Sequence, residues 1–121
     1  MKFTQSLKRN NDFLYIYRKG RFFAGRIIVV HIRPNYSKIN KLGISVSKKA
    51  GNSVRRNRVR RLIRENYRLM EDDLLKGQNI VIGYRNLAEI PDFVAFKKEM
   101  KYIFKRLEIY KPKSMEKDRA L

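Results

Sequence analysis

Basic side chains are concentrated in residues 48–64, where the chain reads KKAGNSVRRNRVRRLIR. This segment contains eight basic residues and no acidic residue. They are Lys48, Lys49, Arg55, Arg56, Arg58, Arg60, Arg61 and Arg64. Arginine predominates, and its planar guanidinium group can donate two hydrogen bonds to one phosphate. Because so many unpaired charges repel one another and lower the stability of the fold, the segment indicates an anionic partner that carries phosphate.

A helix is needed to position these cations. Asn52 or Ser53 is a suitable N-cap. Apolar side chains then recur at steps of three and four, which places them on one side of the helix. They are Val59, Leu62, Ile63, Tyr67 and Met70. The opposite side carries Asn57, Arg60, Arg61, Arg64 and Arg68. We therefore expect a helix that buries one side and presents arginines on the other.

The charge pattern of this helix favours phosphate binding over a surface that is only solvated. A solvated helix usually mixes acids and bases at spacings of four, but Glu65 is the first acid after residue 47. Arg55, Arg56 and Arg58 lie near the helix N-terminus, where the helix dipole disfavours each cation by about 0.3–1 kcal/mol. Free backbone N–H groups at that end attract anions. Phosphate binding is the favoured interpretation, and a solvated surface is the alternative.

The chain as a whole has the composition of a folded, strongly basic protein. Its 121 residues include 30 Lys and Arg against 11 Asp and Glu, giving a net charge of +19 and a pI near 10.6. Hydrophobic residues make up 43%, which is enough for one modest core. Cysteine is absent, so disulfides and thiolate chemistry are excluded. No apolar run suits a signal peptide or a membrane span, and we expect a cytoplasmic protein without a membrane partner.

Two elements are expected before the basic segment. A short helix should begin with Asn10 or Asn11 as its N-cap, continue to about residue 18 and end at Gly20. Residues 22–33 are rich in β-branched and aromatic side chains, which predicts a long strand that could break at residues 24–25.

Four further features complete the predicted element order. Residues 42–47 alternate apolar with small or polar side chains, as a half-buried strand does. Gly77 should end the basic helix, and residues 78–84 predict a buried strand. Pro91 and Asp92 should open a last helix with a broad apolar stripe. Its members are Phe93, Phe96, Met100, Ile103, Phe104 and Leu107.

Residues 42–67, LGISVSKKAGNSVRRNRVRRLIRENY, resemble the signature of the bacterial ribonuclease P protein subunit. That signature is a strand ending in V-S-K-K, a G-N-x-V turn and a helix with R-N-R, found here at residues 46–49, 51–54 and 56–58. Length, basicity and the first helix extend the resemblance over roughly residues 5–110 of a single domain, residues 1–121. We expect residues 111–121 to form a flexible tail.

The resemblance implies an α/β (α+β) two-layer sandwich, similar to a domain of a ribosomal protein. A central mixed sheet of about four strands would be flanked by three helices. It also implies a left-handed βαβ crossover through the arginine helix. Periodicity alone would have predicted the right-handed crossover that about 98% of such units adopt.

The resemblance further implies a protein that assists a catalytic RNA. In that family, the protein and ribonuclease P RNA form a 1:1 complex that removes the 5′ leader of precursor tRNA, and the RNA is the catalyst. Mg²⁺ would be bound mainly by the RNA, so we expect neither a catalytic residue nor a metal site in the protein. The chain has a single histidine, His31, and its acids Glu71, Asp72 and Asp73 are expected to form a solvated helix end.

Two sets of site residues follow from the resemblance. The set that would face the catalytic RNA is Lys48, Lys49, Asn52, Arg56, Asn57, Arg58, Arg60, Arg61, Arg64 and Arg68. The set that would line a cleft for the leader is Phe13, Tyr17, His31, Ser45 and Ser47. His31 stands where the family often has a ring such as Tyr, which makes its contact the weaker one. Rings at helical spacing are often core residues, so core packing is the alternative for Phe13 and Tyr17.

Other classes of basic protein remain open at this point. A structural protein that binds ribosomal RNA would be equally small and basic, and it is the main alternative function. A DNA-binding regulator would need base contacts in a groove and usually a dimer seam, for which the sequence shows no pattern. The spacing K-K-x-G-N-x-V-x-R-N-R favours the ribonuclease P family over both.

Overall fold

The computed structural model describes residues 1–111, and the predicted tail beyond Lys111 lies outside the described residues. The strands are β1 (Thr4–Ser6), β2 (Arg21–Ala24), β3 (Ile28–Pro34), β4 (Asn40–Ser45) and β5 (Gln78–Tyr84). The α-helices are α1 (Asn10–Lys19), α2 (Ser53–Met70) and α3 (Phe93–Arg106). Two short 3₁₀ helices, η1 (Lys48–Ala50) and η2 (Glu71–Asp73), flank α2.

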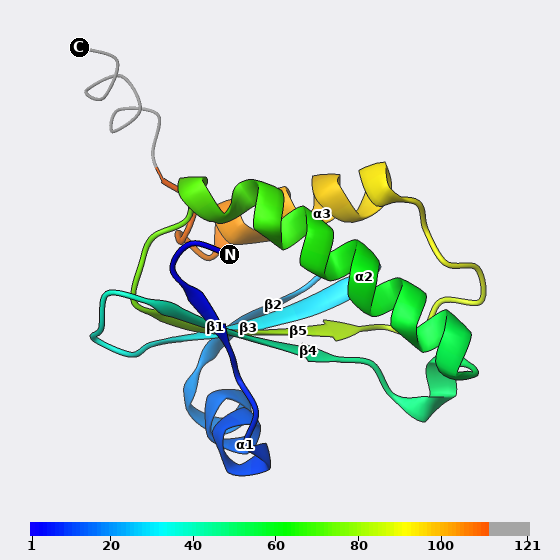
Figure 1. Cartoon of the computed structure of the whole chain (residues 1–121), viewed down its shortest axis with the longest axis horizontal. Helices are drawn as coiled ribbons and strands as arrows, with labels where there is room; N and C mark the ends of the chain where they lie inside the picture. The colour runs from blue at the N-terminus through cyan, green and yellow to red at the C-terminus, as the bar shows by residue number, and fades with distance from the viewer. Residues whose placement is uncertain (112–121) are drawn as a thin grey trace.

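The strands form one mixed sheet with the order β1-β4-β5-β3-β2. β4 is parallel to β1 and β5, whereas β3 is antiparallel to β5 and β2. α2 and α3 cover one face of the sheet, and α1 lies on the other (Figure 1). The predicted α+β architecture is confirmed. The described residues contain five strands instead of about four, because β1 adds a short strand at one edge.

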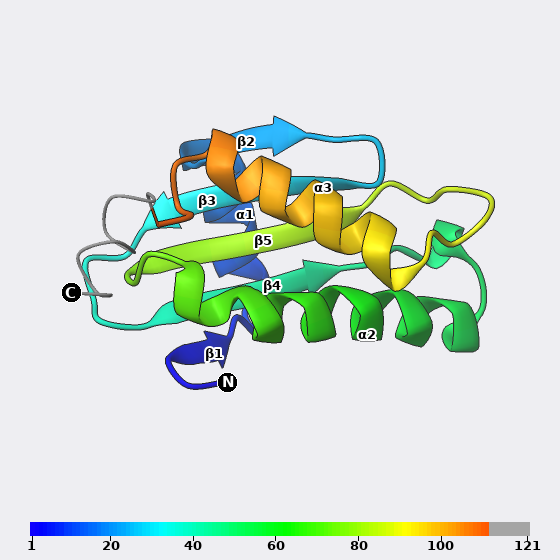
Figure 2. The same ribbon diagram turned by 90° about the horizontal axis from the view of Figure 1, so that it is seen from above.

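The connection β4-α2-β5 is a left-handed crossover. In Figure 2, α2 lies between the viewer and the sheet, β4 and β5 both run from left to right, and β5 lies above β4. A right-handed unit seen from this side would have β5 below β4. The hand that the family resemblance implied is thus present, against the usual preference.

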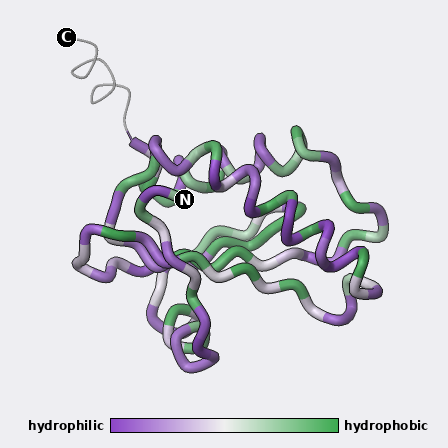
Figure 3. Tube along the Cα trace, viewed as in Figure 1, coloured by the Kyte–Doolittle hydropathy of each residue, from purple (hydrophilic) through white to green (hydrophobic). Residues whose placement is uncertain are grey.

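Most of the core lies between the sheet and the pair of helices α2 and α3. Its fully buried side chains include Ile63 and Tyr67 of α2 and Phe104 of α3. The central strands are accordingly hydrophobic in Figure 3, whereas α2 alternates between hydrophobic and hydrophilic residues. A second, small cluster on the opposite face joins Leu7, Ile16 and Val81, with Phe13 packed against it. No helix within residues 1–111 is long and apolar enough to cross a membrane.

The beginnings of α2 and α3 follow the predicted capping. The side chain of Asn52 accepts a hydrogen bond from the backbone N–H of Arg55 at 3.0 Å. Asp92 does the same for the N–H of Ala95 at 2.8 Å. Each cap satisfies one of the free N–H groups in the first helical turn.

Of two predicted boundaries before the basic segment, one was wrong and one is confirmed. The N-cap of α1 is Arg9, without a side-chain hydrogen bond, so neither Asn10 nor Asn11 caps that helix. The predicted strand does break after Ala24, at the position that the sequence had indicated, and it forms a hairpin, β2 and β3, whose connection is fixed by Glu99. That carboxylate accepts hydrogen bonds from three successive backbone N–H groups, at 2.8 Å each, in residues 26–28. A contact from α3, 71 or more residues away, therefore turns the strand.

Gly77 does not end the basic helix, because α2 stops at Met70 and continues into η2. Gly77 instead precedes β5, with a φ of 87°. A Cβ atom at this position would lie 2.7 Å from the carbonyl oxygen of Ser37. Glycine is therefore required at this turn by its positive φ and by the close approach of another backbone segment.

The sequence predicted that the acids after α2 form a solvated helix end. In the structure they bind other parts of the chain instead. Glu71 is only 2% exposed and accepts hydrogen bonds from the backbone N–H groups of Lys2, at 2.6 Å, and Phe3, at 3.2 Å. Asp72 forms an ion pair with Lys2 at 2.7 Å. Asp73 accepts a hydrogen bond from the hydroxyl of Tyr110 at 3.2 Å. The cluster thus joins both ends of the described chain to the end of α2.

Candidate RNA-binding surfaces

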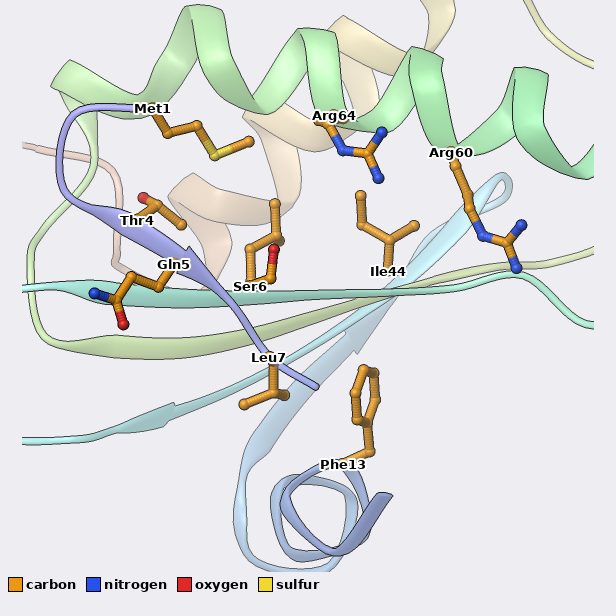
Figure 4. A pocket seen from close by; sticks show the side chains of 10 residues that line it. Met1, Thr4, Gln5, Ser6, Leu7, Phe13, Ile44, Arg60 and Arg64 are labelled. Carbon is orange, nitrogen blue, oxygen red and sulfur yellow. The ribbon is translucent and has the colours of Figure 1, made fainter. Parts of the chain in front are cut away.

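The arginines of α2 lie on two flanks of the helix, above its buried side. Arg60 and Arg64 project towards the sheet edge formed by β1 and β4, where Figure 4 shows them facing Ile44 across a cavity. This cavity has a volume of about 410 Å³ and is also lined by the N-terminal residues Met1 and Thr4. Arg58 and Arg61 line a more open hollow farther along the helix surface, together with Val54, Asn57, Leu62 and Arg64. The helix therefore buries one side and carries its arginines on the two flanks away from it, as the sequence predicted.

The N-terminal turn of α2 adds further cations. Lys48 and Lys49 are exposed on η1, just before the helix begins. Nη2 of Arg56 donates to Oγ of Ser53 at 3.3 Å, but its Nε is buried and has no hydrogen-bond partner within residues 1–111. Arg60 donates to Oδ1 of Asn57 at 3.2 Å. Guanidinium groups near a helix N-terminus have few acceptors to satisfy them, which suits an external anion.

Acidic neighbours do not neutralise this surface. Within residues 1–111 the structure contains two ion pairs, Lys2 with Asp72 and Arg68 with Glu65, the latter at 3.0 Å. Arg68 is therefore the only α2 arginine in the described chain that pairs with a carboxylate. The other predicted RNA-facing arginines keep their charge available for an external phosphate.

On the opposite face of the sheet, α1 crosses the strands along one row of paired residues. The row runs Gly43, Val81, His31 and Phe22, through β4, β5, β3 and β2. A Cβ atom at Gly43 would lie 2.5 Å from the ring of Phe13, so only glycine lets α1 approach this closely. The ring of Tyr17 meets that of His31 edge-on, with centroids 4.8 Å apart.

The next row along the strands is left open by α1. It consists of Ser45, Gly83, Val29 and Ala24, which are paired in register and point to the same face. All four are partly or fully exposed, and they lie at or next to the ends of their strands. A Cβ atom at Gly83 would have no neighbour closer than 3.9 Å. These small residues therefore form a flat, open floor beside α1.

The floor connects with a hollow of about 550 Å³ at its β4 end. The hollow is lined by Phe13, Leu14, Tyr17, Ser45 and Arg60, among others. We call the hollow and the open row together the groove. Ser47 does not line the hollow, because it lies beyond the end of β4 and accepts a hydrogen bond from Nδ2 of Asn86 at 3.2 Å.

Two of the predicted cleft residues have surroundings that limit their chemistry. Burial lowers the pKa of His31, so its imidazole is mainly neutral at pH 7. Phe13 is half-buried and packs against the small cluster of Leu7, Ile16 and Val81, so it is partly a core residue. Within residues 1–111, no three His, Cys, Asp or Glu side chains come together as a metal site would require.

Comparison with known proteins shows the family to which this chain belongs. The family model for ribonuclease P matches residues 1–108. The chain belongs to the ribonuclease P protein family. A relative from Clostridioides difficile, named ribonuclease P protein component, is 42% identical over 107 residues, which cover 88% of this chain and 94% of the relative. A relative of the same name from Clostridium botulinum, strain Loch Maree, is 39% identical over 105 residues, with 86% and 95% covered.

Solved ribonuclease P proteins have the same fold. The structure from Staphylococcus aureus aligns with a TM-score of 0.79 and 34% identity, covering 87% of this chain and 96% of that one. The structure from Thermotoga maritima gives 0.76 and 31%, covering 84% and 96%. The chain is therefore a protein component of ribonuclease P, an enzyme of tRNA processing whose other component is an RNA.

One basic residue of the segment 48–64, Arg55, has a structural role that the sequence did not reveal. Arg55 donates from Nη2 to the carbonyl oxygen of Ala88 at 2.9 Å and from Nε to that of Ala50 at 3.2 Å. It ties the start of α2 to the loop before α3. Arg55 falls at the variable position before R-N-R and was not among the predicted RNA-facing residues, but nothing in the basic run indicated this contact.

The open floor was also missed. Gly83 lies within the strand-like run NIVIGY, and a glycine inside such a run is a known sign of a close approach or an open surface. The sequence cannot show which of the two applies, since that depends on where α1 crosses the sheet.

Proposed function

We propose that the protein binds ribonuclease P RNA through the arginine side of α2 and binds the 5′ leader of precursor tRNA in the groove. It would thereby assist endonucleolytic removal of the leader, with the RNA as catalyst. The observation that carries this proposal is the presence on one small domain of two different surfaces. One is strongly cationic, and the other is open, flat and bordered by rings.

The arginine side suits a folded RNA. Its cations are Lys48, Lys49, Arg56, Arg58, Arg60, Arg61 and Arg64, with Asn52 and Asn57 as polar neighbours and Arg68 at the far end. Lys48, Lys49, Arg56 and Arg58 lie near the N-terminus of α2, and within residues 1–111 none of these cations except Arg68 has an acidic partner. Neutralising about five phosphates would give a slope of log K against log salt of roughly −3 to −5. Such contacts bring affinity without needing a particular base sequence.

The groove suits a single strand. Tyr17 borders it, Phe13 closes its inner end, and Ser45 and Gly83 form its floor. A double helix is too wide to lie on such a floor, whereas unpaired bases can stack on exposed rings and leave their phosphates to nearby cations. Arg60 lines both the groove and the cavity on the α2 side of the sheet edge. It would therefore link the two surfaces.

The proposed division of labour leaves the hydrolysis to the RNA. Mg²⁺ would be held mainly by RNA phosphates, and the protein would lower the repulsion between the two RNAs that must meet. We further propose one protein per ribonuclease P RNA. Precursor tRNA would gain contacts in the groove that mature tRNA, without a leader, cannot make. The mature product would therefore dissociate more readily than the precursor.

Reconstitution tests this proposal directly. The purified chain is mixed with a bacterial ribonuclease P RNA at low magnesium, and cleavage of precursor tRNA is followed. We expect cleavage at the mature 5′ end that the RNA alone does not achieve under these conditions. The absence of any stimulation would contradict the proposal and would revive a purely structural role on another RNA, such as ribosomal RNA.

A further inference from the structure

Phe22 is a large apolar residue on the edge strand β2 that the proposed function does not use. Its side chain is 62% exposed, although the next residue, Phe23, packs against the main core. Exposed apolar rings on an edge strand favour unwanted pairing with other chains. A ring in this position therefore calls for a partner or a role.

The ring of Phe22 belongs to an ordered row of three rings. Phe22 is paired in register with His31, and their rings are stacked with centroids 5.2 Å apart and planes at 23°. The ring of Tyr17 packs edge-on against the ring of His31, with centroids 4.8 Å apart and planes at 80°. The row joins α1, β3 and β2, and it runs alongside the open floor of the groove.

This arrangement changes what His31 can do. Because Phe22 is stacked on it and Tyr17 packs against it edge-on, little of the imidazole is left for a nucleobase. The free aromatic surface at this end is that of Phe22. His31 acts as a spacer that holds the Phe22 ring in a fixed plane, and as a mainly neutral ring it adds no charge that would have to be desolvated.

One cation, Arg33, lies beside the row, where it could meet the phosphates of a nucleic-acid strand. Arg33 lies on the same strand and face as His31, whereas Arg21 points to the other face of the sheet and donates a hydrogen bond to the carbonyl oxygen of Leu107. The guanidinium of Arg33 is fixed over the ring of Tyr15, 4.9 Å from its centroid, and Nη1 donates to the carbonyl oxygen of Lys19 at 2.9 Å. Stacking rings flanked by arginine and lysine are the usual means of holding unpaired bases.

We propose that Phe22 forms a base-stacking subsite at the β2 end of the groove, which takes an unpaired base of the leader. This inference rests on the proposed leader binding and extends it. From Ser45 on β4 to β2 the groove crosses three strand spacings, or about 14 Å. At roughly 3.4 Å per stacked nucleotide, the base on Phe22 is about four nucleotides along the leader from the base near Ser45. Only leaders that reach β2 would occupy the subsite.

The test compares leaders of different length on the reconstituted holoenzyme, under conditions that prevent cleavage. Precursor tRNAs with leaders of about two and about eight nucleotides are used, with mature tRNA as reference. Phe22→Ala should weaken binding of the long leader by roughly tenfold and leave the short leader and mature tRNA unchanged. Phe22→Trp should retain the affinity, because it keeps a ring. Tyr36→Ala is the matched control, since Tyr36 is 95% exposed on the turn between β3 and β4, away from the groove.

The outcomes separate the two proposals. If the wild-type holoenzyme binds precursor and mature tRNA equally, leader binding itself fails and the subsite fails with it. If the wild type prefers the long leader but Phe22→Ala keeps that preference in full, only the subsite is overturned. Equal weakening of both leaders by Phe22→Ala would also overturn it, because the effect would not depend on reaching β2. Circular dichroism of each variant checks that the sheet is intact.

Discussion

Two adjoining rows of residues on the α1 side of the sheet differ in what covers them. In the covered row, Gly43 lies directly under Phe13, and its missing side chain makes room for α1. In the open row, Gly83 lies under nothing, and a side chain added there would point into empty space. Glycine therefore has two different structural roles in neighbouring strands. Gly43 makes room for α1, whereas Gly83 leaves the surface flat and open.

The largest expected effect comes from adding one methyl group to the covered row. The same change in the open row is the control. Gly43→Ala should lower the free energy of unfolding by about 1–3 kcal/mol, because Phe13 or the whole of α1 must move. Gly83→Ala should change it by less than about 0.5 kcal/mol. Urea unfolding of the isolated protein measures both. Equal effects would show that the two rows are not differently covered.

The covered row also depends on Glu71, which accepts hydrogen bonds from the backbone of Lys2 and Phe3. These bonds hold the segment that continues through β1 into Leu7 of the small cluster. Burial raises the pKa of Glu71, but hydrogen bonds from Thr4 and from the backbone of Lys2 and Phe3, with the N-terminal charge, outweigh it. The pKa therefore lies below its ordinary value of 4.5. The stabilisation is complete above the unfolded-state pKa and is lost as the pH falls through the lower, folded-state value.

Glu71→Gln should remove this dependence and lower the free energy of unfolding at neutral pH by about 1–2 kcal/mol. The difference between the wild type and the variant should shrink as the solution is acidified. Unfolding measured at a series of pH values below neutrality checks both statements. A difference that stays constant down to the lowest pH would show that the charge of Glu71 contributes nothing to holding the N-terminal segment.

A ring at the border between the two rows should affect binding more than stability. Tyr17→Ala should weaken the holoenzyme's binding of precursor tRNA by about 1–2 kcal/mol and leave mature tRNA unaffected, because one stacking surface is lost. Parallel titrations with both tRNAs measure this difference. If both weaken equally, Tyr17 does not contact the leader. If the variant unfolds, the alternative that Tyr17 is a core residue is correct.

The arginine side of α2 lies on the other face of the sheet and should respond to salt instead. Arg61→Ala combined with Arg64→Ala should flatten the slope of log K against log salt by roughly 1.4–1.8, if each contacts one phosphate of the folded RNA. Between two salt concentrations that differ by a factor of two, this change amounts to only about threefold in affinity. Titrations of ribonuclease P RNA over a range of salt detect it. An unchanged slope would exclude both arginines from the interface.

Local patterns were enough to predict α2, α3 and their caps. In α2, the apolar side chains and the arginines alternate with a helical period, and Asn52 occupies the N-cap as expected. The same holds for Asp92 and α3. Both predictions depend on neighbours within a few residues, which the sequence displays directly.

Features that depend on distant residues could not be predicted. A break at residues 24–25 was indicated, but its cause, Glu99, was not, and neither was the attachment of β1 by Glu71, since each lies far away in the sequence. The left-handed crossover was implied only by the family resemblance. The open row was likewise invisible, because nothing in residues 78–84 tells where α1 will cross the sheet. A single sequence shows periodicity, but it does not show which faces are covered.

The central claim, that the open row receives the leader, is tested most directly by filling it. Gly83→Val places a side chain on the floor of the groove at a position where a Cβ has no neighbour within 3.9 Å, so the fold should be retained. The measurement is the ratio of affinities of the reconstituted holoenzyme for precursor and mature tRNA. We expect the variant to bind mature tRNA like the wild type and to lose most of the preference for precursor. A variant that is folded and keeps the full preference would contradict the account.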